Sequence, residues 1–228
     1  MTVQEVMHTL ESLGTEQARK IYRRHGAADP MFGVSFAHMG KLQKQIKRDQ
    51  ALAVQLWATG NFDARVLATM IADPQAMSPA ELERWVKDLE GYSLTDLFGK
   101  FVAQTPHARK LREKWMKSKE EFTAQAGWLL LSYAVSGGEG LSDDYLREII
   151  AFIEKNIHSS MNRVRHSMNG VMINIGIHRE PLRPLVLATA ARIGKVVVDH
   201  GETSCETPDA AAYIAKTLAH YAKKKKGA

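Results

Sequence analysis

Two residues whose side chains could take part in catalysis, Tyr92 and Asp96, lie four positions apart near the middle of the chain. The segment from about Gly91 to Gln104 is predicted to be a helix, and residues four apart share one face of a helix. An aromatic ring and a carboxylate should therefore sit side by side. Such a carboxylate is either an ordinary solvated charge or a group that stabilises a cation at the edge of a groove.

Most other kinds of catalytic or metal site are missing from the sequence. One cysteine, Cys205, excludes an internal disulfide framework, and we interpret it as structural. The nine histidines are dispersed without zinc-binding spacing, so we expect no metal site. Neither a GxGxxG phosphate loop nor a GxSxG elbow is present. Any catalytic activity must therefore depend on a small number of residues.

The chain carries a net charge of +6 over 228 residues, which favours an anionic partner. Four of these charges, Lys223–Lys226, predict a basic disordered tail over residues 223–228. The remaining basic residues gather in three clusters, each of which is either a solvated face or a phosphate-binding patch. The clusters are Lys41, Lys44, Lys47 and Arg48; Arg109, Lys110, Arg112, Lys114 and Lys117; and Arg163 with Arg165.

The sequence also bears on location. No stretch approaches the roughly 20 apolar residues that a membrane-spanning helix needs. The first residues, MTVQEVMHTLESL, form an amphipathic helix with acidic side chains rather than a signal peptide. We therefore expect a cytoplasmic protein with no membrane partner.

Apolar residues recur three and four positions apart along nearly the whole chain, which predicts an all-α protein. Residues 1–222 should form a single domain. Serine or threonine followed three residues later by glutamate predicts capping boxes at Thr2, Ser78 and Ser118. The predicted helices cover residues 2–13, 15–25, 35–48, 50–59, 62–73, 79–88, 91–104, 107–116, 119–136, 142–156, 160–177, 180–194 and 208–222.

Helix starts near Ser35, Ser78, Ser118 and Ser160 are spaced by about forty residues, the period of HEAT-type helix pairs. Such pairs bury their apolar faces by stacking on one another. This spacing predicts a right-handed solenoid of HEAT-like antiparallel helix pairs, an α-α superhelix. An irregular helical bundle is the alternative. A solenoid would offer an extended groove, and basic edges would suit it to a long anionic polymer.

One reaction on such a polymer needs little machinery, the hydrolysis of the N-glycosidic bond of a purine alkylated at N3 or N7. The alkylated base already carries positive charge, so it leaves without a strong general acid. A single carboxylate can then stabilise the oxocarbenium-like sugar or position the attacking water. Asp96 is the candidate for this role, with Tyr92 beside it.

Several longer segments resemble the bacterial DNA alkylation repair family, the alkylpurine DNA glycosylases with HEAT-like repeats. In chain order they are FGVSFAHMGKLQKQIK, FDARVLATMIADP, YSLTDLF, NRVRHSMNGVMINIG and GETSCETPDAAAYIAK. The resemblance implies a helical solenoid that binds duplex DNA on its concave face without a metal or organic cofactor. It also implies activity on cationic alkylpurines without a deep base-binding pocket, unlike base-flipping glycosylases.

Active members of that family place two tryptophans, an aspartate and an arginine around the lesion. The aspartate matches Asp96, and Tyr92 stands where the family has one tryptophan. Gln125 falls on the arginine position and Val171 on the second tryptophan position. Trp128, three residues beyond Gln125, either points into the same groove or belongs to the core. The resemblance therefore retains the carboxylate and departs at the other three positions.

A polar stripe marks the predicted helix over residues 160–177, where Arg163, His166, Asn169 and Gly170 follow one another at spacings of three and four. The stripe, with Arg165 beside it, either faces DNA phosphates or faces solvent.

These observations support three hypotheses. The first is a monomeric protein that binds duplex DNA through residues including Lys41, Lys44 and the 160–177 stripe, and that acts as a glycosylase at Asp96. The second is a non-catalytic binder of DNA structures, favoured by Gln125 and Val171. The third is a helical scaffold for protein partners.

Overall fold

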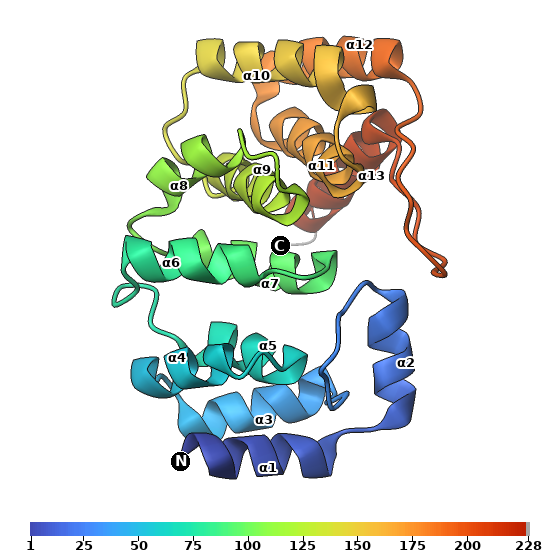
Figure 1. The fold of residues 1–228 in the computed structure, drawn as a ribbon. Coiled ribbons are helices and arrows are strands. Elements are labelled where there is room, and N and C mark those ends of the chain that lie inside the picture. Colours follow the sequence, from blue (N-terminus) through green and yellow to red (C-terminus); the bar gives the residue numbers. More distant parts are fainter. Residues whose placement is uncertain (227–228) are drawn as a thin grey trace. The chain divides into compact units, whose positions relative to one another are not determined.

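The computed structural model describes residues 1–226, and all regular structure in that range is helical (Figure 1). The prediction of an all-α protein is confirmed. Each predicted helix range corresponds to one observed α-helix, because apolar spacing and capping residues specify helices locally. The α-helices are α1 (Val3–Leu13), α2 (Glu16–Arg24), α3 (Phe36–Ile46), α4 (Gln50–Ala58), α5 (Phe62–Ile71), α6 (Pro79–Trp85), α7 (Tyr92–Val102), α8 (Ala108–Trp115), α9 (Glu121–Ser136), α10 (Asp143–Asn156), α11 (Asn162–His178), α12 (Arg183–Ile193) and α13 (Ala210–Lys226).

The residue contacts divide the chain into two compact units. Unit 1 comprises Met1–Lys114 with Gly201–Thr203, and unit 2 comprises Trp115–His200 with the chain from Ser204 onward. The single domain over residues 1–222 stays a prediction. No helix within residues 1–226 is both long and apolar enough to cross a bilayer.

The expected basic tail begins inside a helix. The α13 backbone is helical through Lys226, so residues 223–226 continue this helix, and a disordered tail over residues 223–228 stays a prediction. Alanine and lysine are good helix formers, which explains how the helix continues through this run. Residues 227 and 228 lie outside the described part of the chain.

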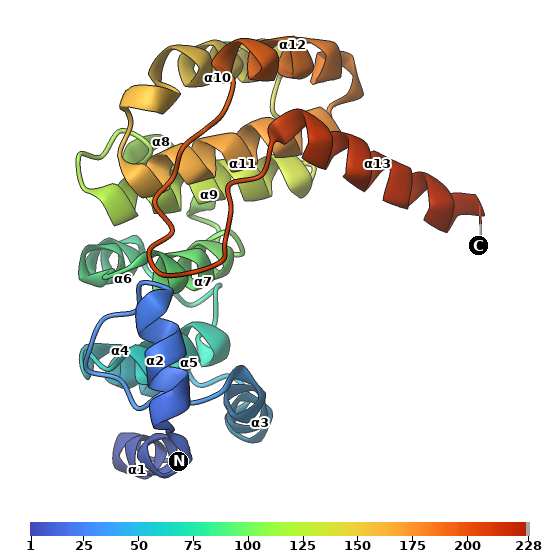
Figure 2. The same ribbon diagram turned by 90° about the vertical axis from the view of Figure 1, so that its right-hand side faces the viewer.

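Unit 1 is built on a stack of aromatic side chains between its helices. The rings of Trp57 and Trp85 are parallel, with centroids 4.1 Å apart, and Trp57 also contacts Phe98 of α7. These contacts join α4, α6 and α7, while α2 runs at a steep angle to α1 (Figures 1 and 2). Burial of these large rings supplies much of the apolar stabilisation of this unit. It also sets the position of α7, which carries Tyr92 and Asp96.

The predicted helix caps are partly confirmed. Thr2 and Glu5 form a full capping box, in which each side chain accepts from the other residue's backbone N–H. Ser78 caps α6 by accepting from the Glu81 N–H, but the Glu81 carboxylate accepts from Trp85 instead of reaching back. The box predicted at Ser118 is wrong. There the Glu121 carboxylate accepts from the backbone N–H of Arg163, so a contact between α9 and α11 replaces the local cap.

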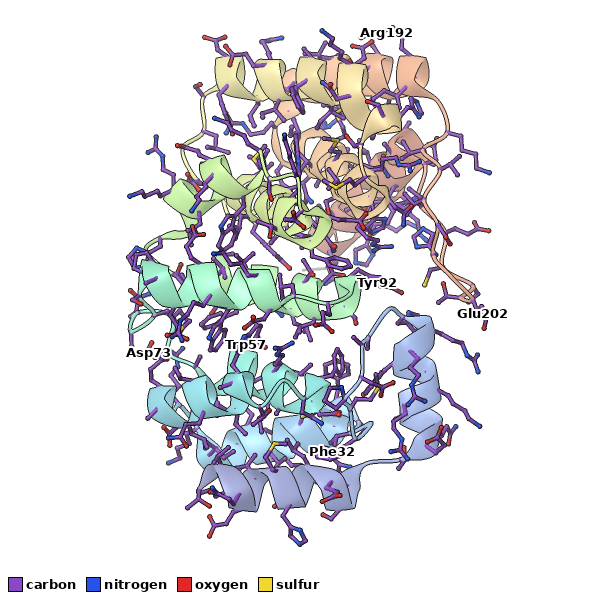
Figure 3. All side chains as sticks on the ribbon, viewed as in Figure 1. Phe32, Trp57, Asp73, Tyr92, Arg192 and Glu202 are labelled. Carbon is purple, nitrogen blue, oxygen red and sulfur yellow. The ribbon has the colours of Figure 1, made fainter. Side chains whose placement is uncertain are left out.

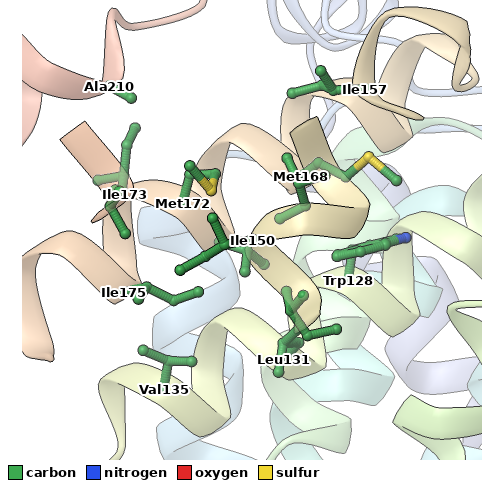
Figure 4. Close-up of a cluster of buried hydrophobic side chains, with 14 of the residues drawn as sticks. Trp128, Leu131, Val135, Ile150, Ile157, Met168, Met172, Ile173, Ile175 and Ala210 are labelled. Atoms are coloured by element: carbon green, nitrogen blue, oxygen red, sulfur yellow. The ribbon is translucent and has the colours of Figure 1, made fainter. Parts of the chain in front are cut away.

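Unit 2 has its own apolar core, in which Trp128, Leu131 and Ile150 pack with the buried side of α11 (Figure 4). Gly127 allows the close approach of α9 to the end of α8, since a Cβ there would lie 2.3 Å from the Met116 nitrogen. α10 and α12 lie together over α9 and α11, and α13 extends away from them (Figure 2). The segment of residues 194–209 joins α12 to α13 without regular structure.

Candidate nucleic-acid interface

A groove with a volume of about 640 Å³ lies on unit 1, and we call it the basic groove. It is formed by α3, α5 and α7 and by the turn that follows α5. Its lining residues are Phe36, Gln43, Lys44, Lys47, Arg48, Thr69, Met70, Ala72, Pro74, Leu97, Lys100, Phe101 and Gln104.

Four cations from two helices converge on the basic groove. Lys44, Lys47 and Arg48 come from the end of α3, and Lys100 comes from α7. All four are exposed, and Arg48 pairs with Asp73 at 2.9 Å across a mostly solvated contact. The predicted cluster at residues 41–48 therefore lines a groove, except for Lys41, which is exposed on α3 but does not line it.

Lys47 adopts an unusual backbone conformation at the end of α3. Its φ is 66°, in the left-handed region that a residue with a Cβ rarely adopts. Its N–H still donates to the Gln43 carbonyl at 2.7 Å, which closes the helix. A glycine would fit this position without strain, so the fold holds a lysine in the groove at a cost in stability.

Asp96 lies on α7 one helical turn before Lys100, which lines the basic groove. Tyr92, Asp96 and Lys100 follow at intervals of four, and the neighbouring Leu97 lines the groove with Lys100. Asp96 and Tyr92 are both half-buried, while the opposite face of α7 is fully buried through Leu94 and Phe98. The carboxylate therefore lies one turn from a residue of the cationic groove, but it is not among the lining residues.

Tyr92 is held by the end of α2. The hydroxyl of Tyr92, which is labelled in Figure 3, lies 3.1 Å from Nδ1 of His25. The Tyr92 ring also packs against Gly26, since a Cβ added to Gly26 would lie 2.8 Å from the ring. Gly91 also packs closely against the Gly26 backbone, because a Cβ added to Gly91 would lie 1.5 Å from the Gly26 carbonyl oxygen. Both glycines have positive φ, at 73° and 89°. This glycine pair fixes where α7 begins and where the Tyr92 ring lies.

The other end of the basic groove is organised by a buried carboxylate. Asp63 is fully buried on α5 and accepts the backbone N–H groups of Phe32, Gly33 and Val34 at 2.6, 3.0 and 2.8 Å. Three such bonds satisfy the charge within the fold. They hold the segment that leads to Ser35, the N-cap of α3.

The polar stripe of α11 contacts the segment of residues 194–209. Asn169 of the stripe and the neighbouring Asn162 and Arg165 bind the backbone of the segment between α12 and α13. Asn162 donates to the Asp199 carbonyl at 2.8 Å, Arg165 donates to Val197 at 3.0 Å, and Asn169 donates to Pro208 at 2.9 Å. These bonds give three side chains of α11 a structural partner in the segment, and a contact of the stripe with DNA stays a prediction.

His166 of α11 contacts His200 of the segment, with their rings edge to face and centroids 5.5 Å apart. Burial lowers the pKa of His166 to about 4, and the positive charge of Arg163 and then His200 add to this. Burial and Arg163 also lower the pKa of His200, while Asp199 acts in the opposite direction. Arg163 itself is only 5% exposed. Both histidines are therefore neutral at neutral pH and offer phosphate no charge.

Three further predicted DNA contacts lie inside unit 2. Gln125 and Val171 are 0% exposed and Trp128 is 1% exposed. Trp128 stacks on Phe152, with centroids 5.9 Å apart, which supports the reading of Trp128 as core. These side chains present no surface to a ligand, because tertiary packing covers positions that the helical pattern leaves open.

Among the lining residues that sequence reasoning missed are Lys100 and Phe36. The signal for Lys100 was its place one helical turn beyond Asp96, on the same face. Phe36 had no such signal, since an apolar residue at a helix start is usually buried against the preceding segment. Among the described residues, no three His, Cys, Asp or Glu side chains gather as ligands for a metal ion.

The comparisons with known proteins agree with one another. Residues 6–214 match the family model of the DNA alkylation repair enzyme. A solved structure is similar with a TM-score of 0.88 and 31% identity, covering 96% of this chain and 95% of the other. That structure is described as "a new family of proteins related to the HEAT-like repeat DNA glycosylases with affinity for branched DNA structures". The similarity confirms the prediction of a HEAT-like repeat fold.

Two bacterial relatives match over nearly their full length. The uncharacterized protein Lin0241 of Listeria innocua is 29% identical over 225 residues, which is 95% of this chain and 97% of that protein. The uncharacterized protein Lmo0209 of Listeria monocytogenes is 27% identical over 222 residues, again 95% and 97%. Since the family model spans most of the chain and the HEAT-like fold agrees with it, this protein belongs to the DNA alkylation repair enzyme family.

Proposed function

We propose that this protein binds DNA through the basic groove of unit 1, with Lys44, Lys47, Arg48 and Lys100 contacting phosphates. The observation that carries the proposal is the convergence of these four cations from α3 and α7 on one groove. Each cation that neutralises a phosphate releases condensed counterions, which makes such a set an effective DNA-binding surface. Action on DNA is also consistent with the expected cytoplasmic location.

The form of DNA that we propose is branched, with duplex arms that the groove also contacts. Affinity for branched DNA structures is a property of the similar solved protein. A branch presents both paired phosphates and bases without partners. Plain duplex DNA, the ligand expected from the sequence, should then bind more weakly to the same cations.

Salt titration tests this proposal most directly. Four phosphate contacts predict that log affinity falls with log salt with a slope of about −3 to −4. Lys44→Gln and Lys100→Gln should each weaken binding several-fold on every DNA sequence and reduce the slope by about 1. Lys155→Gln, at an exposed lysine of α10, is the matched control and should leave both values unchanged. A flat salt dependence in the wild-type protein would favour the scaffold function instead.

A second candidate function is alkylpurine excision at Asp96. It is favoured by the half-buried position of Asp96 on α7, one helical turn from Lys100 and one turn from a tyrosine that His25 and Gly26 hold in place. In this reaction the carboxylate would stabilise positive charge at the sugar as the base departs. Tyr92 would contribute an aromatic face to the cation.

Release of 7-methylguanine from alkylated DNA is the assay for this second candidate. The wild-type protein should release the base, and Asp96→Asn should reduce release by roughly 100-fold or more while DNA binding persists. The substitution conserves volume, so lost folding does not explain the loss. If the wild-type protein binds branched DNA and releases no base, it is a non-catalytic binder, as Gln125 and Val171 at the family's arginine and tryptophan positions suggest.

A further inference from the structure

Phe36 stands out among the residues that line the basic groove. It is the first residue of α3, and its side chain is 52% exposed. The other exposed residues of the lining are polar or charged, including Lys44, Lys47 and Lys100. An exposed phenyl ring in such a lining offers apolar area that a ligand can cover, which favours binding.

The ring of Phe36 is held in a fixed position from behind. It meets the ring of Tyr22 edge to face, with centroids 6.1 Å apart, and Tyr22 in turn contacts Phe62 at 5.6 Å. The Tyr22 hydroxyl donates to the Val34 carbonyl at 2.6 Å, and burial followed by the charge of Asp63 raises the pKa of Tyr22. Tyr22 therefore stays protonated and bonded, and it forms a rigid support for the exposed ring.

The start of α3 is fixed as well. Asp63 binds three successive backbone N–H groups just before the helix, and the Ser35 side chain accepts from the His38 N–H. Phe36 is thus an exposed aromatic surface whose backbone and ring are both preorganised. A preorganised surface loses little conformational entropy when a ligand binds.

We propose that Phe36 stacks on an unpaired base of the DNA whose phosphates the groove cations contact. This inference rests on the proposed function and names the feature of the DNA that the groove selects. From Phe36 to Lys47 the α3 helix rises about 16 Å, which leaves room for several nucleotides between the ring and the cations. Aromatic side chains stack on any base, because every base offers a π-face.

In continuous duplex DNA the faces of each base are covered by its neighbours. A base becomes available for stacking on Phe36 at a junction, a flap or a gap, where pairing stops. Stacking on Phe36 would therefore make the protein prefer branched DNA over continuous duplex DNA.

The experiment uses a three-way DNA junction with 2-aminopurine at the unpaired position next to the branch, and a continuous duplex of the same sequence. Stacking on an aromatic ring should quench the 2-aminopurine fluorescence when the wild-type protein binds. Phe36→Leu should abolish the quenching and weaken junction binding by about 5- to 10-fold, with less than a twofold change for the duplex. Phe36→Trp should restore both the quenching and the affinity.

Phe152→Leu provides the matched control, because Phe152 is similarly exposed, at 50%, but lies on α10 of unit 2 against Trp128. It should leave the quenching intact. Equal losses on junction and duplex for Phe36→Leu would overturn the stacking role, as would an unquenched signal with the wild-type protein at every unpaired position. Either result leaves the groove cations to be judged separately, by the salt slopes of the lysine variants.

Discussion

The Tyr92 hydroxyl lies 3.1 Å from Nδ1 of His25, and this bond joins the start of α7 to the end of α2 across 67 positions of sequence. It holds the aromatic ring that stands next to Asp96 on α7. The ring is closed in from the other side by Gly26. The candidate site therefore depends on α2, although no chemistry is assigned to that helix.

Removing this bond should destabilise unit 1 modestly. His25→Ala and Tyr92→Phe should each lower the free energy of unfolding by about 1 kcal/mol, the typical net value of such a hydrogen bond. The double variant should lose less than the sum of the two, with a coupling energy of about 0.5–1.5 kcal/mol. Urea unfolding of the four proteins measures the coupling, and additive losses would mean that the two side chains do not interact in solution.

Gly91→Ala adds one methyl group but should destabilise the fold strongly. The new Cβ would lie 1.5 Å from the Gly26 carbonyl oxygen, and φ at Gly91 is 89°, so backbone must move. We expect a loss of at least 3 kcal/mol in the free energy of unfolding. Gly40→Ala is the control, since Gly40 lies within α3 and a Cβ there would have no atom within 4 Å. It should instead stabilise by about 0.5–1 kcal/mol.

Lys47→Gly should separate stability from DNA binding. Glycine adopts the φ of 66° without strain, so the melting temperature should rise and the free energy of unfolding should increase by about 1 kcal/mol. Loss of the ammonium group should at the same time weaken DNA binding and reduce the salt slope. Lys44→Ala, in regular helix one turn earlier, should weaken binding with little change in stability. An unchanged or lower melting temperature for Lys47→Gly would mean that the lysine is not strained.

Acid should loosen the segment of residues 194–209 from α11. The pKa of His166 is lowered from 6.5 to about 4 in the folded protein, so the unfolded chain binds more protons between these values. Stability is then complete above pH 6.5 and falls as the pH drops toward 4, by on the order of 2–3 kcal/mol. Arg163 opposes protonation of both His166 and His200, and Asp199 partly offsets this at His200.

Urea unfolding at pH 7.5 and pH 4.5 measures this dependence, and His166→Phe should make it shallower because the titrating group is gone. Protease sensitivity within residues 194–209 should rise over the same pH range in the wild-type protein. A pH dependence that is identical in the wild-type and His166→Phe proteins would assign the loss of stability to other groups.

Local patterns in the sequence were sufficient to determine the helices. Apolar spacing, Thr2 with Glu5, and serines such as Ser35 and Ser78 specify where helices begin, because a cap bonds to groups within its own first turn. The carboxylate at Asp96 and the lysines near residue 44 were likewise found from spacing along a single helix, since residues three and four apart share a face. The stacking and phosphate roles assigned to them remain proposals.

Contacts between distant segments were decided only by the tertiary structure. Glu121 caps the Arg163 backbone instead of its own helix, the α11 stripe seats residues 194–209, and Gln125 is buried. Lys100 joins Lys44 in one groove because α7 and α3 both reach it. Helical periodicity specifies which side chains share a face, but the partner that each face meets depends on packing energies summed over the whole unit, which no single segment encodes.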